Sequence, residues 1–231
     1  MNLRCFTVGL FQVNAWLIED PETGACALID TGENDEVASE LAALTPRPDL
    51  RAILLTHAHF DHAGGLVPLQ ALYPQAETCL PRLERPMFDL LPRQGELFGA
   101  PQFSKPCGRI DREIDDDELV RVGALECRFV STPGHTPGQG CWQVGGHLFV
   151  GDTIFAGSVG RTDFPLSDPG LAQKSLAKLM TLPGELHVHC GHGPDTTLAA
   201  ELKGNPYLAH VRRALGIKEP RGGYARGGSW G

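Results

Sequence analysis

Short runs of apolar residues, bounded by turn-forming residues, dominate the first third of the chain and predict strands. These strands are expected at residues 4–8, 14–19, 25–29, 52–55 and 76–80. Helical spacing of apolar residues predicts helices at residues 35–44 and 66–72. The first three strands are joined by short turns and should form an antiparallel meander. The strands that alternate with helices should pair in parallel.

The same patterns continue in the second half of the chain. Strands are expected at residues 118–122, 125–131, 140–144, 147–150 and 185–190, and helices at residues 169–180, 196–202 and 209–215. Between the halves, residues 81–117 contain many prolines and glycines. This stretch predicts a long surface loop with a short helix near residues 83–91, and such loops are often functional lids.

Composition indicates a soluble globular protein. The 231 residues are 42% hydrophobic and 21% charged, and the formal net charge of -8 argues against a nucleic-acid partner. No apolar stretch approaches the roughly 20 residues that span a bilayer. The N-terminus lacks the plan of a signal peptide, and the seven cysteines contain no C-x-x-C pair. We therefore expect a cytoplasmic protein with reduced cysteines, no membrane contact, one domain over residues 1–215 and a flexible Gly/Arg-rich tail over residues 216–231.

One loop concentrates candidate chemistry. Thr56-His57-Ala58-His59-Phe60-Asp61-His62 follows the buried run at residues 52–55 and precedes Gly64-Gly65. Loops at strand ends are where rigid scaffolds present functional groups. Imidazole and carboxylate ligands together suit zinc, iron or manganese. The loop therefore predicts part of a metal site, provided that other segments supply the remaining ligands.

Three further segments supply such ligands at the ends of predicted strands. His135 lies in Thr132-Pro133-Gly134-His135-Thr136-Pro137-Gly138, Asp152 follows Gly151, and His192 lies between two glycines. The complete candidate set is His57, His59, Asp61, His62, His135, Asp152 and His192. Seven ligands exceed the needs of one tetrahedral zinc ion, and none is a cysteine, so the set suits two metals with open positions for water.

Other polar groups have simpler interpretations. His187 and His189 alternate with apolar residues on a strand and are interpreted as structural or supporting residues. Adjacent carboxylates at Asp115-Asp116-Asp117-Glu118 do not converge on one point, so this run is interpreted as a solvated turn.

The pattern T-H-x-H-x-D-H at residues 56–62, together with His135, Asp152 and His192, resembles the metallo-β-lactamase superfamily. The segments at residues 151–153, 160–163, 191–194 and 205–208 are similar to its short hydroxyacylglutathione hydrolase-like (glyoxalase II-like) branch. The resemblance implies an α/β protein with a four-layer αββα sandwich, mixed sheets and metals at the sheet edge. It also implies two divalent ions, zinc first, with iron or manganese as alternatives.

The same resemblance assigns roles to residues. It places His57, His59, His135 and Asp152 on metal 1, and Asp61, His62, Asp152 and His192 on metal 2. It implies a metal-bridged hydroxide that attacks a thioester such as S-lactoylglutathione. Asp152 bridges the metals and Asp61 steers the hydroxide, so both count as catalytic. Arg161 is the expected anion contact for the thiol carrier, and Asp30 and Asp163 are candidate supports for the imidazoles.

Alternative functions stay open at this point. Persulfide dioxygenases resemble this sequence in the G-R-T-D-F loop and use one iron on residues matching His57, His135 and Asp152. Lactonases resemble it in H-x-H-x-D-H and P-G-H-T-P-G. True β-lactamases lack a bridging carboxylate at the position of Asp152. Only about 20 residues follow Leu208, so most of the helical element that binds glutathione in longer relatives is expected to be missing. A metal-binding or RNA-binding module without activity conflicts with the full ligand set, and the oligomeric state is left open.

Overall fold

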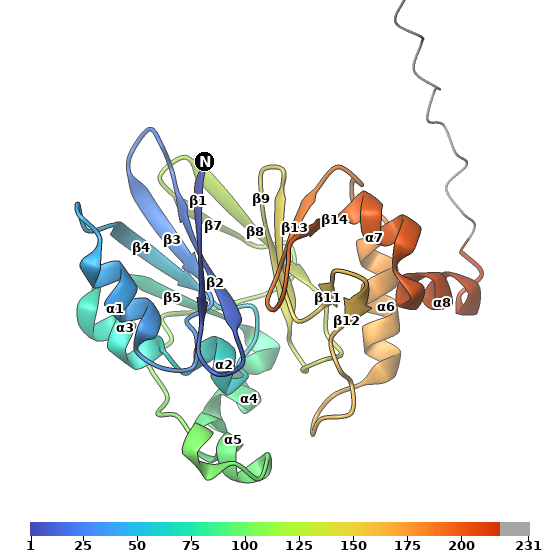
Figure 1. Cartoon of the computed structure of the whole chain (residues 1–231), viewed down its shortest axis with the longest axis horizontal. Coiled ribbons are helices and arrows are strands. Elements are labelled where there is room, and N and C mark those ends of the chain that lie inside the picture. The colour runs from blue at the N-terminus through green and yellow to red at the C-terminus, as the bar shows by residue number, and fades with distance from the viewer. Residues whose placement is uncertain (218–231) are drawn as a thin grey trace, which may run out of the picture.

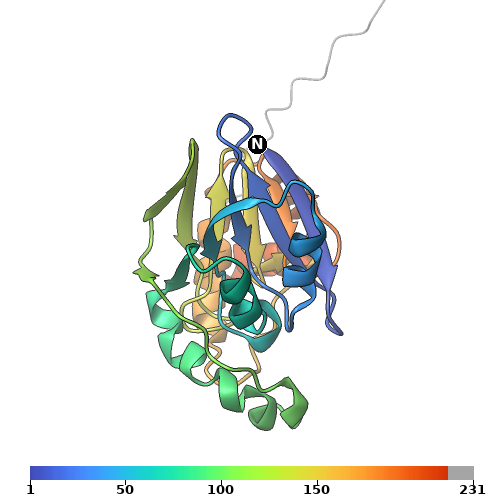
Figure 2. The ribbon, with the colours of Figure 1, turned by 90° about the vertical axis from the view of Figure 1, so that its left-hand side faces the viewer.

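Two six-stranded β-sheets lie face to face at the centre of the molecule (Figure 1). They are seen in a computed structural model, and the structure describes residues 1–217. Helices cover the outer side of each sheet, so the layers run helix, sheet, sheet, helix (Figures 1 and 2). This is the four-layer αββα sandwich expected from the sequence. The predicted tail at residues 216–231 lies, except for its first two residues, outside the described part of the chain.

The first sheet is mixed, as predicted. Its strands are, in spatial order, β1 (Asn2–Val8), β2 (Val13–Glu19), β3 (Ala25–Ile29), β4 (Asp49–Leu54), β5 (Glu77–Pro81) and β6 (Arg112–Ile114). The first three strands form the antiparallel meander. From β3 to β6 each pairing is parallel. The parallel strands β4 and β5 therefore end at the same edge of the sheet, where β4 leads into the histidine-rich loop.

The second sheet is antiparallel apart from one pair. Its strands are, in spatial order, β14 (Thr196–Thr197), β13 (His187–Cys190), β10 (His147–Gly151), β9 (Gly140–Val144), β8 (Leu125–Ser131) and β7 (Leu119–Val122). Strands β10 and β13 are parallel. Because their carboxyl ends point the same way, Asp152 and His192 emerge side by side. A separate small hairpin is formed by β11 (Ile154–Phe155) and β12 (Ser158–Val159).

Three apolar cores separate the four layers. On the first sheet, one core packs beneath the helices α1 (Glu36–Ala43), α2 (Phe60–Ala63), α3 (Leu66–Leu72), α4 (Arg85–Asp89) and α5 (Leu91–Leu97). On the second sheet, another packs beneath α6 (Pro169–Leu179), α7 (Leu198–Gly204) and α8 (Pro206–Ala214). Between the sheets, the third core includes Trp16, Trp142 and Phe129. Burial of this apolar area favours the sandwich.

Residues 81–117 are more ordered than the predicted loop. They contain the 3₁₀ turns η1 (Arg82–Glu84) and η2 (Pro101–Phe103), the helices α4 and α5, and strand β6. The short helix predicted near residues 83–91 is present as α4, but the loop predicted for the rest of this stretch was wrong. Pro86 and Pro92 lie in the first turns of α4 and α5, where a proline removes no helical hydrogen bond.

The last helix also begins earlier than predicted. A break at residues 204–208 and a helix from residue 209 were expected, but α8 begins at Pro206. The Asn205 Oδ1 atom accepts hydrogen bonds from the backbone N–H groups of Tyr207 (2.9 Å) and Leu208 (3.4 Å). Asn205 is therefore an N-cap and Pro206 the first helical residue, a combination that starts helices. Within the described residues, no helix has the length and apolarity that a bilayer crossing requires.

The two tryptophans of the inter-sheet core differ in one interaction. Trp142 Nε1 donates a hydrogen bond to the Leu55 carbonyl at 3.0 Å, immediately before the histidine-rich loop. Trp16 Nε1 is buried without a hydrogen-bond partner. Trp142 therefore links the second sheet to the end of β4 by a polar contact, and Trp16 contributes packing alone.

We expect Trp142→Phe to lower the free energy of unfolding by about 1–3 kcal/mol more than Trp16→Phe, because only the first leaves a buried carbonyl without its donor. Urea denaturation of both variants measures this difference. Since both substitutions remove the same atoms, Trp16→Phe is the matched control. Equal losses in the two variants would show that the bond to Leu55 contributes nothing.

Candidate metal centre

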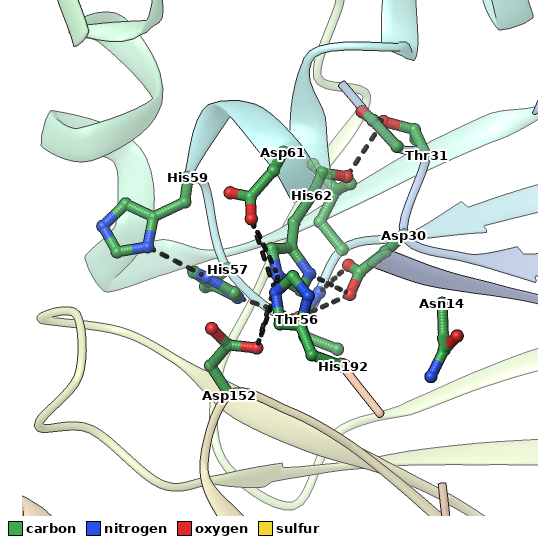
Figure 3. Close-up of polar contacts among 12 residues, drawn as sticks. Asn14, Asp30, Thr31, Thr56, His57, His59, Asp61, His62, Asp152 and His192 are labelled. Carbon is green, nitrogen blue, oxygen red and sulfur yellow. Dashed lines mark hydrogen bonds and ion pairs between the residues drawn. The ribbon is translucent and has the colours of Figure 1, made fainter. Parts of the chain in front are cut away.

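The seven predicted ligands converge at one end of the sandwich, between the two sheets. His57, His59, Asp61 and His62 come from the loop after β4 and from α2, whereas His135, Asp152 and His192 follow β8, β10 and β13. Figure 3 shows the four residues of the first segment facing Asp152 and His192 from the opposite sheet. Sequence reasoning placed all seven at strand ends, and the structure brings all seven together.

The first segment changes direction at His59. Residues 60–63 form α2, a single helical turn that follows the extended residue His59. Adjacent residues on a helix point about 100° apart, so Asp61 and His62 diverge from His59 toward His192. The sequence analysis had treated this stretch as a loop throughout. The turn divides the segment, with His57 and His59 before the bend and Asp61 and His62 within it.

Asp152 reaches the first segment because its neighbour is a glycine. Gly151 has a φ of +47°, and a Cβ atom there would come within 2.4 Å of Thr56 Oγ1. Only glycine allows both this backbone conformation and this approach. The end of β10 thus lies against Thr56, and the Asp152 carboxylate is directed between the histidines.

One group of ligand atoms consists of nitrogens from His57, His59 and His135. His59 Nδ1 lies 3.2 Å from His57 Nε2 and 3.0 Å from His135 Nε2. All three side chains are buried. These residues are the histidines that the sequence analysis assigned to metal 1.

A second group consists of Asp61, His62 and His192. The Nε2 atoms of His62 and His192 are 3.2 Å apart, and Asp61 Oδ2 lies 3.4 Å from His192 Nε2. Asp152 lies between the two groups, with Oδ1 3.3 Å from His62 Nε2 and Oδ2 3.5 Å from His135 Nε2. One carboxylate therefore contacts both groups, as the predicted bridge requires.

The arrangement fits two metal ions. In each of the triads His57–His59–His135, His57–His62–Asp152 and Asp61–His62–His192, the ligand atoms lie within 4.8 Å of one another. Two nitrogens bound tetrahedrally to one zinc ion are about 3.3 Å apart, given Zn–N bonds of about 2.0–2.1 Å. The nitrogen separations of 3.0–3.2 Å are close to this value. Asp152 Oδ1 is buried and lacks a hydrogen-bond partner, which a cation would supply.

The outward-facing nitrogens of four imidazoles have partners that fix the rings. His57 Nδ1 donates to Thr56 Oγ1 at 3.0 Å, and His62 Nδ1 donates to Asp30 Oδ2 at 2.8 Å. His135 Nδ1 donates to the carbonyl of Arg161, and His192 Nδ1 donates to the carbonyl of Phe11. With Nδ1 protonated, each Nε2 presents its lone pair toward the centre, as a metal ligand must.

The two candidate supporting carboxylates behave differently. Asp30 is buried and accepts hydrogen bonds from His62, from Thr56 Oγ1 at 2.8 Å and from the backbone N–H of Thr56 at 2.8 Å. Asp163 contacts no histidine of the site. Its carboxylate forms a two-pronged ion pair with Arg161, whose backbone carbonyl accepts the hydrogen bond from His135.

Charges within the site compensate one another. Burial lowers the pKa of His57 well below its usual value and that of His59 to about 3, so both rings are neutral. Burial also opposes ionisation of Asp152, but the neighbouring His62 outweighs it and lowers the Asp152 pKa. Despite burial, the carboxylates around His62 raise its pKa well above the usual value, and Asp61 helps to raise the pKa of His192. A cation that binds there must displace protons from these two rings.

Three buried polar residues that the sequence analysis missed hold the ligand loops. The Glu84 carboxylate accepts hydrogen bonds from the backbone N–H groups of Ala58 (2.9 Å) and Gly138 (2.6 Å). It therefore joins the segment of His57 to the segment of His135. Gln94 accepts from the Phe60 N–H and donates to the Ala58 carbonyl.

On the opposite side of the site, Asn14 Nδ2 donates to the carbonyls of Cys190 and Gly193, which flank His192. No local pattern marks these three residues, because each is defined by contacts with distant parts of the chain.

A cleft of about 690 Å³ opens beside the ligands, and we call it the aromatic cleft. It is lined by six phenylalanines, namely Phe11, Phe60, Phe98, Phe103, Phe155 and Phe164. Its polar lining residues include His59, Asp61, His135, Asp152, His192 and Arg161. Arg161 pairs with Asp163 and lies over the Phe164 ring at 4.4 Å. The predicted anion contact thus lines the cleft, but its guanidinium is already engaged.

The remaining polar groups singled out from the sequence lie apart from the centre. His189 bonds to Asp195 and to His147 and stacks on Phe149, in keeping with a structural role. Members of the acidic run pair with basic residues on the surface, for example Asp116 with Lys178. All seven cysteines are free, and Cys5 and Cys107 are exposed.

Comparisons with known proteins identify relatives over almost the whole chain. A profile of the metallo-beta-lactamase superfamily matches residues 8–192. Hydroxyacylglutathione hydrolase GloC of Haemophilus influenzae is 31% identical over 212 residues, which cover 90% of this chain and 98% of that protein.

Two solved structures are similar over comparable lengths. The first is TTHA1623 in a di-iron-bound form, with a TM-score of 0.77 and 35% identity over 88% of this chain and 99% of the other. The second is the BLEG-1 B3 metallo-beta-lactamase, with a TM-score of 0.80 and 29% identity over 90% of this chain and 99% of the other.

The linking role of Glu84 can be tested by Glu84→Gln. The substitution keeps the size of the side chain but places an NH₂ group opposite one of the two backbone N–H donors. We expect a loss of about 1–3 kcal/mol in the free energy of unfolding, and zinc binding about tenfold weaker or more because the supports of the ligands are disturbed. Urea denaturation and calorimetric zinc titration measure the two effects. The exposed Glu96→Gln on α5 is the control, and unchanged zinc affinity in Glu84→Gln would contradict the role assigned to Glu84.

Proposed function

Because the chain belongs to the metallo-β-lactamase superfamily, we propose that it is a binuclear metal-dependent hydrolase that cleaves a thioester of the S-2-hydroxyacylglutathione type. The observation that carries the proposal is the position of Asp152 between two groups of ligands, in contact with His62 of one and His135 of the other. A carboxylate in this position suits a site for two ions that act together on one water.

The ligands are proposed as in the sequence analysis, with Asp152 common to both ions. Metal 1 takes His57, His59 and His135, and metal 2 takes Asp61, His62 and His192. When bound, two divalent ions supply Lewis acidity that lowers the pKa of a shared water toward neutral pH. Nitrogen and oxygen ligands accept zinc, iron and manganese, so the ligand set alone does not select the metal. We propose zinc, with iron as the alternative suggested by the di-iron form of TTHA1623.

The residues of the chain orient the reactants and receive the protons. The Asp61 carboxylate, which lines the aromatic cleft, accepts a hydrogen bond from the attacking water and directs a lone pair of the water oxygen toward the carbonyl carbon. A carbon–oxygen bond forms, the carbon–sulfur bond breaks, and the products are a carboxylate and a thiol. Arg161, at the rim of the cleft, contacts an anionic group of the thiol carrier once its pairing with Asp163 is exchanged.

Two comparisons bear on the choice of substrate. The similarity to GloC supports a hydroxyacylglutathione thioester. The similarity to the BLEG-1 B3 metallo-beta-lactamase makes β-lactam hydrolysis the second candidate. We favour the thioester because the Asp152 carboxylate lies between the two groups of ligands. The family resemblance implies that true β-lactamases have no bridging carboxylate at this position.

Turnover of S-lactoylglutathione by the zinc-loaded protein tests the proposal. Parallel assays use a chromogenic cephalosporin, a panel of lactones, and oxygen uptake with glutathione persulfide by the iron-loaded protein. We expect thioester hydrolysis alone. Without thioester turnover, hydrolysis of the cephalosporin would identify a β-lactamase and hydrolysis of a lactone would identify a lactonase. Oxygen uptake without thioester turnover would identify a persulfide dioxygenase.

The role of Asp61 is tested by Asp61→Asn. We expect kcat to fall by about 100-fold or more, because an amide accepts the hydrogen bond of the water poorly and takes no proton. Asp89→Asn, which alters an exposed carboxylate paired with Arg85, is the control and should keep wild-type kcat. Near-normal kcat in Asp61→Asn would remove Asp61 from the reaction.

A further inference from the structure

The phenylalanines of this protein are concentrated at the candidate metal centre. Six of the ten line the aromatic cleft, while the other four, Phe6, Phe88, Phe129 and Phe149, are buried in the cores. The six come from five separate stretches of the chain, so local sequence composition does not explain the cluster. Concentrations of partly exposed apolar side chains commonly mark binding sites.

Five of these rings form a continuous row. Phe164 contacts Phe98 (5.5 Å between ring centroids), Phe98 contacts Phe60 (6.2 Å), and Phe60 stacks on Phe103 (5.1 Å). Phe11 closes the row by edge contacts with Phe60 and Phe103. Arg161 lies over Phe164 at the opposite end. The row therefore has one cationic end and one wholly apolar end.

The candidate metal centre lies alongside this row. The His59 ring meets Phe98 at 5.8 Å and Phe164 at 5.7 Å, and His192 donates a hydrogen bond to the Phe11 carbonyl. A molecule whose reacting carbon lies at the centre thus has the Arg161 end of the cleft on one side. On the other side it has the rings of Phe11, Phe60 and Phe103.

Charge in the aromatic cleft does not favour an acidic group at its apolar end. Among the described residues that line the cleft, Arg161 is the sole lysine or arginine, and it is already paired with Asp163. A carboxylate on the acyl group would therefore meet the apolar rings of Phe11, Phe60 and Phe103, whereas an alkyl or aryl group would meet complementary surface.

From this arrangement we infer that the apolar end of the aromatic cleft is an acyl-binding site that selects thioesters with a hydrophobic acyl group. The inference rests on the proposed thioesterase reaction, with the thiol carrier directed toward Arg161. Phe11, Phe60 and Phe103 then enclose the acyl chain, and each additional buried methylene strengthens binding in the transition state. Phe11 is 42% exposed, so much of its ring is open to such contact.

The direct test compares acyl groups on one thiol. The zinc-loaded protein is assayed with the acetyl, hexanoyl and phenylacetyl thioesters of N-acetylcysteamine. We expect kcat/KM to be at least about tenfold higher for the hexanoyl and phenylacetyl substrates than for acetyl, as hydrophobic pockets discriminate by added methylenes. Equal values across the series, or a preference for acetyl, would overturn the inference. Absence of hydrolysis with these thioesters and with S-lactoylglutathione would instead contradict the proposed function itself.

A second series places the hydrophobic group on the thiol. Acetyl thioesters of hexanethiol and of N-acetylcysteamine are compared in the same assay. We expect little difference, because the thiol side of the substrate lies toward Arg161. If hydrophobicity accelerates the reaction on the thiol side and not on the acyl side, the assignment of the apolar end to the acyl group is wrong.

Variants connect the preference to the named rings. Phe11→Ala and Phe103→Ala should each lower the ratio of hexanoyl to acetyl kcat/KM by about threefold or more, and a circular dichroism spectrum equal to that of the wild type shows that each variant is folded. Leu10→Ala is the matched control, because Leu10 is the neighbour of Phe11, is 73% exposed and does not line the cleft. An unchanged ratio in both phenylalanine variants would contradict the inference. Should either variant lose acetyl activity as well, Phe103→Leu, which keeps apolar bulk, must retain the wild-type ratio.

Discussion

Burying four imidazole rings and an ionised carboxylate in one place is unfavourable unless their polar atoms have partners, and the surrounding residues bond the outward-facing nitrogens of three of these rings. His57, His62 and His135 are buried, as is Asp152. The outward-facing nitrogens of these three histidines bond to a hydroxyl, a carboxylate and a backbone carbonyl, respectively. The inward-facing atoms remain for cations. This constraint explains why the buried Asp30 lies behind His62, and why the two sheets meet where their strand-end loops carry ligands.

Hydrogen bonds between buried side chains and backbone groups link the two halves of the site. Glu84 joins the segments of His57 and His135, and Asn14 joins the first sheet to the turn that carries His192. Both are buried polar side chains with satisfied hydrogen bonds, which favour one arrangement of the loops over others. The centre is therefore preorganised by neighbours that are themselves not ligands.

Much of this arrangement follows from local sequence, and part of it does not. Sequence patterns located β4, β8 and β13, and the histidines in the loops that follow these strands indicated a metal site, because both signals lie within a few residues of each other. Glu84 and Gln94 escaped prediction because their partners are distant in sequence. They also lie in residues 81–117, most of which was predicted to be a surface loop. The aromatic cleft was not predicted either, because Phe11 and Phe103 are distant in sequence and become neighbours only in the folded chain.

The same end of the sandwich therefore combines two chemically different surfaces. The second sheet contributes Asp152 and His192 to a charged centre, while the helices over the first sheet contribute the rings of Phe60, Phe98 and Phe103. In the proposed reaction the centre activates water and the rings position the substrate.

The central claim is that Asp152 belongs to both metal sites. Zinc content after dialysis, measured by mass spectrometry for wild type and Asp152→Ala, tests it directly. Asp195→Ala is the control, because that carboxylate pairs with His189 away from the centre. If Asp152 is common to both sites, we expect two zinc ions per chain in wild type and in the control, and loss of zinc from both sites in Asp152→Ala. Retention of two ions in Asp152→Ala would contradict it.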